Sequence, residues 1–132
     1  MQWTLAFGEP CGAAVVRTSG VFNAADHGKM VVDIVSHPDW FPGHHIMFDH
    51  RQLSFDGTGY AEILIVRENH ARYEARIGTA RSAILMKSGA DYGFGRQFEM
   101  LFDGHVSARV QIFTDEQVAT DWLCDTPEPQ AR

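Results

Sequence analysis

The sequence predicts an α/β protein with a mostly parallel sheet, an antiparallel strand pair at its N-terminus and about four helices. Strand-length apolar segments alternate with helix-length amphipathic segments after the second strand, and this spacing requires crossover connections between parallel strands. Only a short turn separates the first two strand-like segments, so these can pair as antiparallel neighbours. We expect one domain over residues 1–124 and a disordered tail over 125–132.

The first strands are predicted from alternation and turn residues. Trp3, Leu5 and Phe7 fall on one side of the opening strand, and a turn with glycine and proline leads to a second strand over residues 13–22.

A first helix is predicted to begin after Asn23, whose side chain can cap it, and to run to about Ser36. Pro38 restricts the preceding residue to extended backbone and ends this helix. Residues 44–53 are apolar in the middle and polar at both ends, which predicts a central strand.

A second helix is predicted from Tyr60 to Arg76, because apolar residues recur there at near-helical intervals. The segment 62–66 could form a strand when taken alone, but residues 61–76 contain neither glycine nor proline and favour the helix. Residues 80–87 then form a third core-strand candidate.

The last third of the chain predicts a helix, an edge strand and a final helix. Gly104 can end the helix in the left-handed conformation, and residues 106–113 alternate apolar and polar side chains. Thr114 and Gln117 have the spacing of a capping box before the final helix. The buried face of the third helix should consist of Phe94, Phe98, Leu101 and Phe102.

The charge balance and the apolar runs disfavour two classes of partner. The chain has 11 Lys and Arg against 17 Asp and Glu, a formal charge of −6, so nucleic acid is not expected as a partner. No apolar run approaches the length needed to span a bilayer, and the N-terminus lacks the basic segment of a signal peptide.

The two cysteines, Cys11 and Cys124, lie far apart in sequence and show no C-x-x-C spacing. They therefore predict neither a disulfide framework nor a zinc site, and we expect a reduced, cytoplasmic compartment.

Candidate groups for metal binding and catalysis lack a suitable arrangement. His44 and His50 would lie ~20 Å apart along a strand, and His45 and Asp49 ~13 Å apart, too far for one ion. No nucleophile elbow or dinucleotide fingerprint is present. We therefore expect no catalytic residue, no metal and no cofactor.

The turn between the central strand and the second helix is the strongest site candidate. It consists of Asp56, Gly57, Thr58 and Gly59 and should lie at the carboxyl edge of the sheet, where ligands of α/β proteins often bind. If Asp56 caps the helix, the amides of the next three residues point outward at the positive end of the helix dipole, beside the Thr58 hydroxyl. The plain interpretation is that these are ordinary turn and cap residues.

The segment IMFDHRQLSFDGTGYAEI resembles that of STAS domains, the anti-sigma-factor-antagonist fold. Asp49 matches the acid on the strand, and residues 56–59 match the D-S-S-G-type turn, with Gly57 in place of a serine. The resemblance implies that Thr58 is the phosphoacceptor of a partner kinase and that phosphorylation releases a partner.

Residues 13–123 are more similar to the SpoIIAA-like branch, small proteins related to STAS domains and to the CRAL-TRIO lipid carriers. The matching pieces are SGVF, PG before IMFDHR, RSAIL, YGFGRQFE and VQIFTDEQVATDWL, in this order. This resemblance implies a STAS-like sheet.

Two functions follow as expectations. The first is a non-catalytic regulatory or protein-interaction module with a kinase or receptor as partner. The alternative is a carrier of an apolar or lipid-like molecule held near Trp40, Phe41, Tyr92 and Phe94, although aromatic residues in a loop can equally serve as plugs. Arg96 could contact an anionic ligand, and the edge strand 106–113 could pair across a homodimer.

Overall fold

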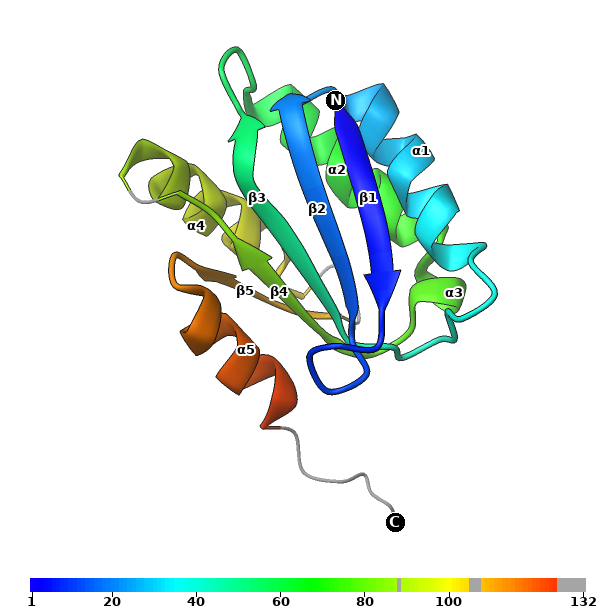
Figure 1. Ribbon diagram of the computed structural model, residues 1–132. Coiled ribbons are helices and arrows are strands. Elements are labelled where there is room, and N and C mark those ends of the chain that lie inside the picture. Colours follow the sequence, from blue (N-terminus) through cyan, green and yellow to red (C-terminus); the bar gives the residue numbers. More distant parts are fainter. Residues whose placement is uncertain (88, 105–107, 126–132) are drawn as a thin grey trace.

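The computed structural model describes residues 1–87, 89–104 and 108–125, and these form a mixed five-stranded sheet (Figure 1). The spatial order is β1-β2-β3-β4-β5; β1 is antiparallel to β2, and the remaining neighbours are parallel. This confirms the predicted fold class. The strands are β1 (Gln2–Phe7), β2 (Ala14–Val21), β3 (Ile46–Ser54), β4 (Arg81–Leu85) and β5 (Arg109–Phe113).

Helices cover both faces of the sheet. The side chains of α1 and α4 pack on one face, and α5 packs alone on the other among the described elements, in front of the sheet in Figure 1. α2 lies on the same side as α1 and α4, because it contacts both. The helices are α1 (Ala24–Val35), α2 (Tyr60–Arg72), α3 (Glu74–Ile77), α4 (Ala90–Phe102) and α5 (Glu116–Cys124).

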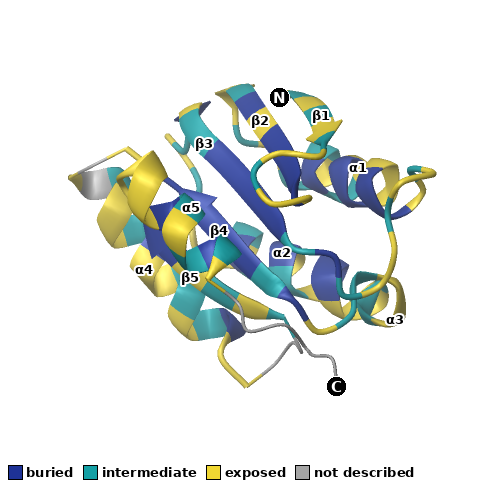
Figure 2. Cartoon of the chain, turned by 60° about the horizontal axis from the view of Figure 1, so that its bottom comes forward, coloured by how far each residue is buried: buried dark blue, intermediate teal, exposed yellow. Residues whose placement is uncertain are grey.

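The central strands are buried on both faces. In β3, Ile46 and Phe48 belong to the core beneath α1 and α4, whereas Met47 belongs to the core beneath α5. Figure 2 shows β3 and β4 as largely buried. Two-sided burial agrees with the short apolar runs at the start of β3 and at the end of β4, in which apolar residues do not alternate with polar ones.

Most predicted element boundaries agree with the structure, including the cap of α1, where Asn23 Oδ1 accepts a hydrogen bond from the Asp26 amide at 2.9 Å. Gly104 follows α4 with φ of +78°, as expected for a helix stop. The final helix differs, because Asp115 caps it and not Thr114. The predicted second helix is divided at Tyr73 into α2 and α3. Residues 105–107 of the predicted edge strand and 126–132 of the predicted tail lie outside the described residues.

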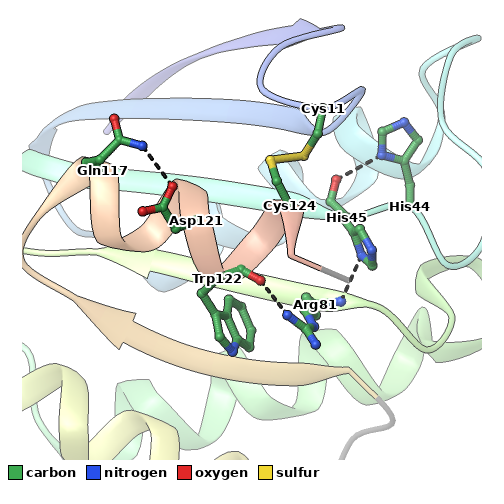
Figure 3. Close-up of a disulfide and its surroundings, with 8 residues drawn as sticks. All are labelled: Cys11, His44, His45, Arg81, Gln117, Asp121, Trp122 and Cys124. Carbon is green, nitrogen blue, oxygen red and sulfur yellow. Dashed lines mark hydrogen bonds between the residues drawn. A yellow bond between two sulfur atoms is a disulfide. The ribbon is translucent and has the colours of Figure 1, made fainter. Parts of the chain in front are cut away.

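The two cysteines are joined, so the expectation that they form no disulfide framework is wrong (Figure 3). Cys11 and Cys124 form a disulfide across a sequence separation of 113 residues. Their proximity has a topological reason. Because α5 starts at the carboxyl end of β5 and returns across the sheet, its last residue reaches the amino ends of the parallel strands, where the β1–β2 turn lies. The argument from these cysteines for a reduced compartment therefore no longer holds.

Arg81, the first residue of β4, provides a second attachment for the end of α5 (Figure 3). Its guanidinium donates a hydrogen bond to the Trp122 carbonyl and lies 5.1 Å from the centre of the Trp122 ring. Its backbone amide donates to His45 Nδ1 at 3.1 Å. A cation at a helix C-terminus also complements the helix dipole.

The loop before β3 packs tightly against Gly78, which has φ of +77°. A Cβ at this position would lie 2.9 Å from the Pro42 carbonyl carbon and still closer to the Gly43 nitrogen. Both contacts are with backbone, so no side chain can move away to relieve them.

We predict that Gly78→Ala lowers the free energy of unfolding by about 3 kcal/mol, because it combines left-handed strain with backbone overlap. Gly57→Ala is the matched control, since Gly57 has φ of +79° and nothing within 4 Å of its would-be Cβ. It should cost only about 1 kcal/mol. Urea unfolding of both variants measures the difference, and equal losses would show that the contact with the loop is not tight.

Candidate functional site

The β3–α2 connection forms a β-turn at the carboxyl edge of the sheet (Figure 1). The Thr58 amide donates to the Phe55 carbonyl at 3.0 Å, and Gly57 takes the positive φ that the turn requires. The Asp56 amide donates to Ser54 Oγ at 3.2 Å. Thr58 is half-buried and lies in neither a strand nor the core, whereas Asp56 and Gly57 are exposed.

The N-terminus of α2 is capped differently from the expectation. Gly59 is the N-cap residue, and its amide donates to Glu62 Oε1 at 2.7 Å. The condition considered for this turn, that Asp56 caps the helix, is therefore not met, and the amides of Thr58 and Gly59 are not free for an anion. A glutamate three residues after the cap position was the sequence signal that could have identified this arrangement.

Two large apolar side chains lie exposed beside the turn. Val21, the last residue of β2, is 57 % exposed, and it pairs with Ser54 at the end of β3. Tyr60, the first residue of α2, is 62 % exposed. We call Val21, Asp56, Gly57, Thr58 and Tyr60 the turn surface.

Phe55 anchors the turn from below. Its ring centre lies 5.6 Å from Phe22, 5.9 Å from His50 and 5.1 Å from Phe94. These four rings line a cavity of about 30 Å³ beneath the turn. Such a volume accommodates water-sized molecules and no lipid chain.

Three buried or half-buried histidines form a cluster, with His27 on α1, His70 on α2 and His50 on β3. Thr18 Oγ1 and His50 Nδ1 are 2.7 Å apart, and the rings of His27 and His70 are 5.8 Å apart. Burial lowers the pKa of His50 and of His70 to about 4 and lowers the pKa of His27 well below its ordinary value. All three are therefore neutral at pH 7, and burial is the main cause of their lowered pKa values. His70 stands among the residues at near-helical intervals that predicted helix α2, but this spacing does not indicate that the three histidines lie close together.

Asp49, the strand acid of the resemblance, lies on the opposite face of the sheet. It is 7 % exposed, and it accepts hydrogen bonds from Arg17 at 2.6 Å and from Arg51 at 2.9 Å. Burial alone would raise its pKa, but the Arg51 hydrogen bonds and the charges of both arginines outweigh burial and lower the pKa. Arg51 also bonds Glu116 at 2.8 Å, so Asp49 belongs to a network that fastens the start of α5.

The expected aromatic patch is divided between the two ends of the sheet. Trp40 and Phe41 precede β3 at the amino end, whereas Tyr92 and Phe94 follow β4 at the carboxyl end. A single ligand near all four, as expected from the sequence, is therefore excluded.

At the amino end, Trp40 closes the space beneath the loop. Its Nε1 donates to the Arg76 carbonyl at 2.8 Å, and its ring stacks on His44. The cavity behind it measures about 20 Å³. Phe41 remains 53 % exposed. Trp40 thus serves as the plug, the second of the two roles considered for this loop.

At the carboxyl end, the residues of α4 differ in exposure. Phe94 is half-buried in the ring cluster, and Tyr92 is 37 % exposed. Arg96 is exposed and forms an ion pair with Glu99 at 2.9 Å, one turn along its own helix.

Neither a metal-binding cluster nor a membrane-spanning helix occurs within residues 1–87, 89–104 and 108–125. No group of three or more His, Cys, Asp or Glu in this part of the chain lies close enough to hold a metal ion. Among its helices, none combines the length and apolar character that crossing a bilayer requires.

We predict that the free energy of unfolding falls as the pH is lowered from 6.5 to 4. His70 is 8 % exposed and has its pKa near 4 when folded against 6.5 when unfolded, so unfolding takes up its proton in this window. Acidification through this window removes about 3 kcal/mol of the free energy of unfolding through this one histidine, a contribution that is fully present above pH 6.5.

The measurement is urea unfolding at pH 7 and at pH 4. His70→Leu should reduce the loss on acidification by about 3 kcal/mol relative to the wild type. Phe102→Leu is the packing control, because the Phe102 ring lies 4.9 Å from His70 and carries no proton. It should lower stability equally at both pH values, and an unchanged acid loss in His70→Leu would contradict the assignment.

The comparisons with known proteins concern the fold alone. No protein-family model matches the chain, and no match was found among curated proteins. A solved structure of an uncharacterised protein of the DUF3478 family, with a SpoIIAA-like fold, from Shewanella loihica matches with a TM-score of 0.60 and 15% identity. The match covers 93% of this chain and 93% of that one. The chain therefore has a SpoIIAA-like α/β fold, as its sequence resemblance predicted.

Proposed function

We propose that this protein is a non-catalytic interaction module that binds a partner protein through the turn surface. The observation that carries the proposal is the exposure of Val21 and Tyr60, 57 % and 62 %, on either side of the turn. Exposed apolar side chains grouped around a carboxyl-edge turn are typical of a contact surface.

The state of the reactive side chains supports a non-catalytic role. The histidines nearest the turn are neutral and enclosed by the core. Asp49 is ionised and bound by Arg17 and Arg51, so it has no proton to donate and little freedom to accept one. General acid–base chemistry requires a group that is both accessible and tuned near the working pH.

Thr58 is proposed as the residue that controls binding. A phosphate on its hydroxyl would add nearly two negative charges to the turn surface, two residues after the exposed Asp56. The amides of Thr58 and Gly59 already donate to Phe55 and Glu62 and would not neutralise it. The charge would therefore stay on the surface and weaken an apolar contact.

The small cavities argue against the carrier alternative. The spaces beneath the turn and behind Trp40 measure about 30 Å³ and 20 Å³, whereas drug-sized ligands occupy pockets of roughly 300 Å³ or more. A hollow of about 430 Å³ beside Tyr92 is larger, but it is open to solvent, and the other three aromatic residues of the expected patch do not line it. A lipid-like ligand would require the packed rings of Phe55 or Trp40 to move out. We therefore favour the interaction module.

We predict that Tyr60→Ser reduces capture of the partner from extracts of the source cells about tenfold, because it removes the largest apolar group of the turn surface. Met100→Ser is the matched control, since Met100 is 71 % exposed on α4 and lies outside the turn surface. Quantitative mass spectrometry of the captured proteins gives the ratio. If every captured protein binds both variants as it binds the wild type, the turn surface is not the contact.

The switch has its own prediction. Thr58→Glu should weaken binding of the same partner, whereas Thr58→Val should bind normally and should no longer incorporate phosphate from ATP in the extract. Peptide mass spectrometry of the wild-type protein after incubation locates the phosphate. Phosphate elsewhere, or none, would remove the switch and leave the interaction surface to be judged by Tyr60→Ser.

A further inference from the structure

The helix α5 is fastened at both of its ends by specific bonds. At its start, Glu116 pairs with Arg51 at 2.8 Å. At its end, the Trp122 carbonyl accepts a hydrogen bond from Arg81, and Cys124 is bonded to Cys11. Between these attachments, few side chains reach the core.

The sheet face beneath α5 is strongly apolar. Ala119 and Leu123 are the core residues that the helix contributes, both 0 % exposed. Among the described elements, α5 is the helix that packs on this face, so the face loses its cover if the helix moves. The residues of the face are Ala13, Val15, Met47, Ala83, Leu85 and Phe113.

The two cysteines of the disulfide differ in solvent exposure. Cys11 is exposed in the turn between β1 and β2, whereas Cys124 is half-buried at the end of α5 (Figure 3). A Cβ added at Gly8 or at Gly12 would meet nothing within 4 Å, so the space next to these two positions of the turn is open. An external thiolate can therefore approach the sulfur of Cys11 without displacing packed residues.

The backbone at Cys11 is held by its own turn. Cys11 and Gly12 have φ of +47° and +80°, and the Ala13 amide donates to the Pro10 carbonyl at 2.8 Å. These are the features of a hydrogen-bonded β-turn with two positive φ angles. The turn can therefore keep Cys11 exposed both before and after the disulfide opens.

We propose that Cys11–Cys124 is an exchangeable disulfide that a dithiol opens in the folded protein, by attack at Cys11 Sγ, and that its opening releases the end of α5 from the sheet. The site is a thiol-modification site on the opposite face of the sheet from the histidine cluster, and it is independent of the turn surface.

The exchange proceeds in two displacement steps. One thiolate of the dithiol bonds to Cys11 Sγ and displaces Cys124 as a thiolate. The second thiolate of the dithiol then attacks the other sulfur of the dithiol, which is bonded to Cys11, and displaces Cys11 as a thiolate. The protein gains two electrons and two protons as two thiols, and the dithiol becomes a cyclic disulfide or its protein equivalent.

The opening is confined to one end of the helix. The pair between Glu116 and Arg51 holds the start of α5 through charges that the exchange does not change. After reduction, the Arg81 hydrogen bond to the Trp122 carbonyl still holds the other end, which no longer has its covalent link. The last turn should then detach transiently and expose the apolar face.

The first experiment identifies the attacked sulfur. The folded protein is treated with reduced glutathione at neutral pH, quenched in acid and analysed by peptide mass spectrometry. The expected product carries glutathione on Cys11, with Cys124 as a free thiol. Glutathione found on Cys124, or a disulfide that reacts only when urea unfolds the protein, would overturn the proposal.

The second experiment measures the opening by amide hydrogen exchange with and without dithiothreitol. Amides in the last turn of α5 should exchange about tenfold faster after reduction, and those of α1 and β3 should not change. The Cys11→Ser/Cys124→Ser double variant is the control, because it should show the fast exchange under both conditions. Unchanged exchange in α5 would overturn the proposal, and so would equal acceleration in α1 and β3, which would indicate a purely structural disulfide.

Discussion

The burial of the central strands on both faces is the constraint on which the rest of this structure depends. β3 and β4 have parallel neighbours on each side and carry apolar residues on both faces, so each face needs a helical cover. The crossover helices α1, α2 and α4 cover one face, and among the described elements α5 covers the other alone. This imbalance explains why α5 has an ion pair at its start and both a hydrogen bond and a disulfide at its end.

The same division decides the chemistry of the buried polar groups. On the face covered by three helices, His50 and His70 are enclosed without a counter-charge strong enough to offset burial, so they stay neutral. On the face with one helix, Asp49 is buried as well, but two arginines reach it from β2 and β3. Neither arrangement leaves an accessible proton donor or acceptor, and this is why interaction at the edges of the sheet is the favoured function.

The two ends of the sheet have different roles. At the carboxyl end, the turn surface presents Val21 and Tyr60 above a cluster of aromatic rings anchored by Phe55. At the amino end, Trp40 closes the core and the disulfide attaches α5 to the β1–β2 turn. A partner that binds the turn surface and a thiol that attacks Cys11 would thus act at separate places on one rigid sheet.

The sequence by itself determined the strands, the helices and the class of fold. Periodicity records which side of a local segment is buried, and the order of the motifs carried the SpoIIAA-like resemblance that the solved structure supports. It also placed Thr58 in a turn at the carboxyl edge, but it left open which residue caps α2, because aspartate and glycine fit many turns. Only the tertiary structure decided that Cys11 meets Cys124 and that Trp40 and Tyr92 lie at opposite ends of the sheet. Such relations depend on strand order and on the direction in which each helix returns, and local residue patterns do not encode the distance between segments far apart in the chain.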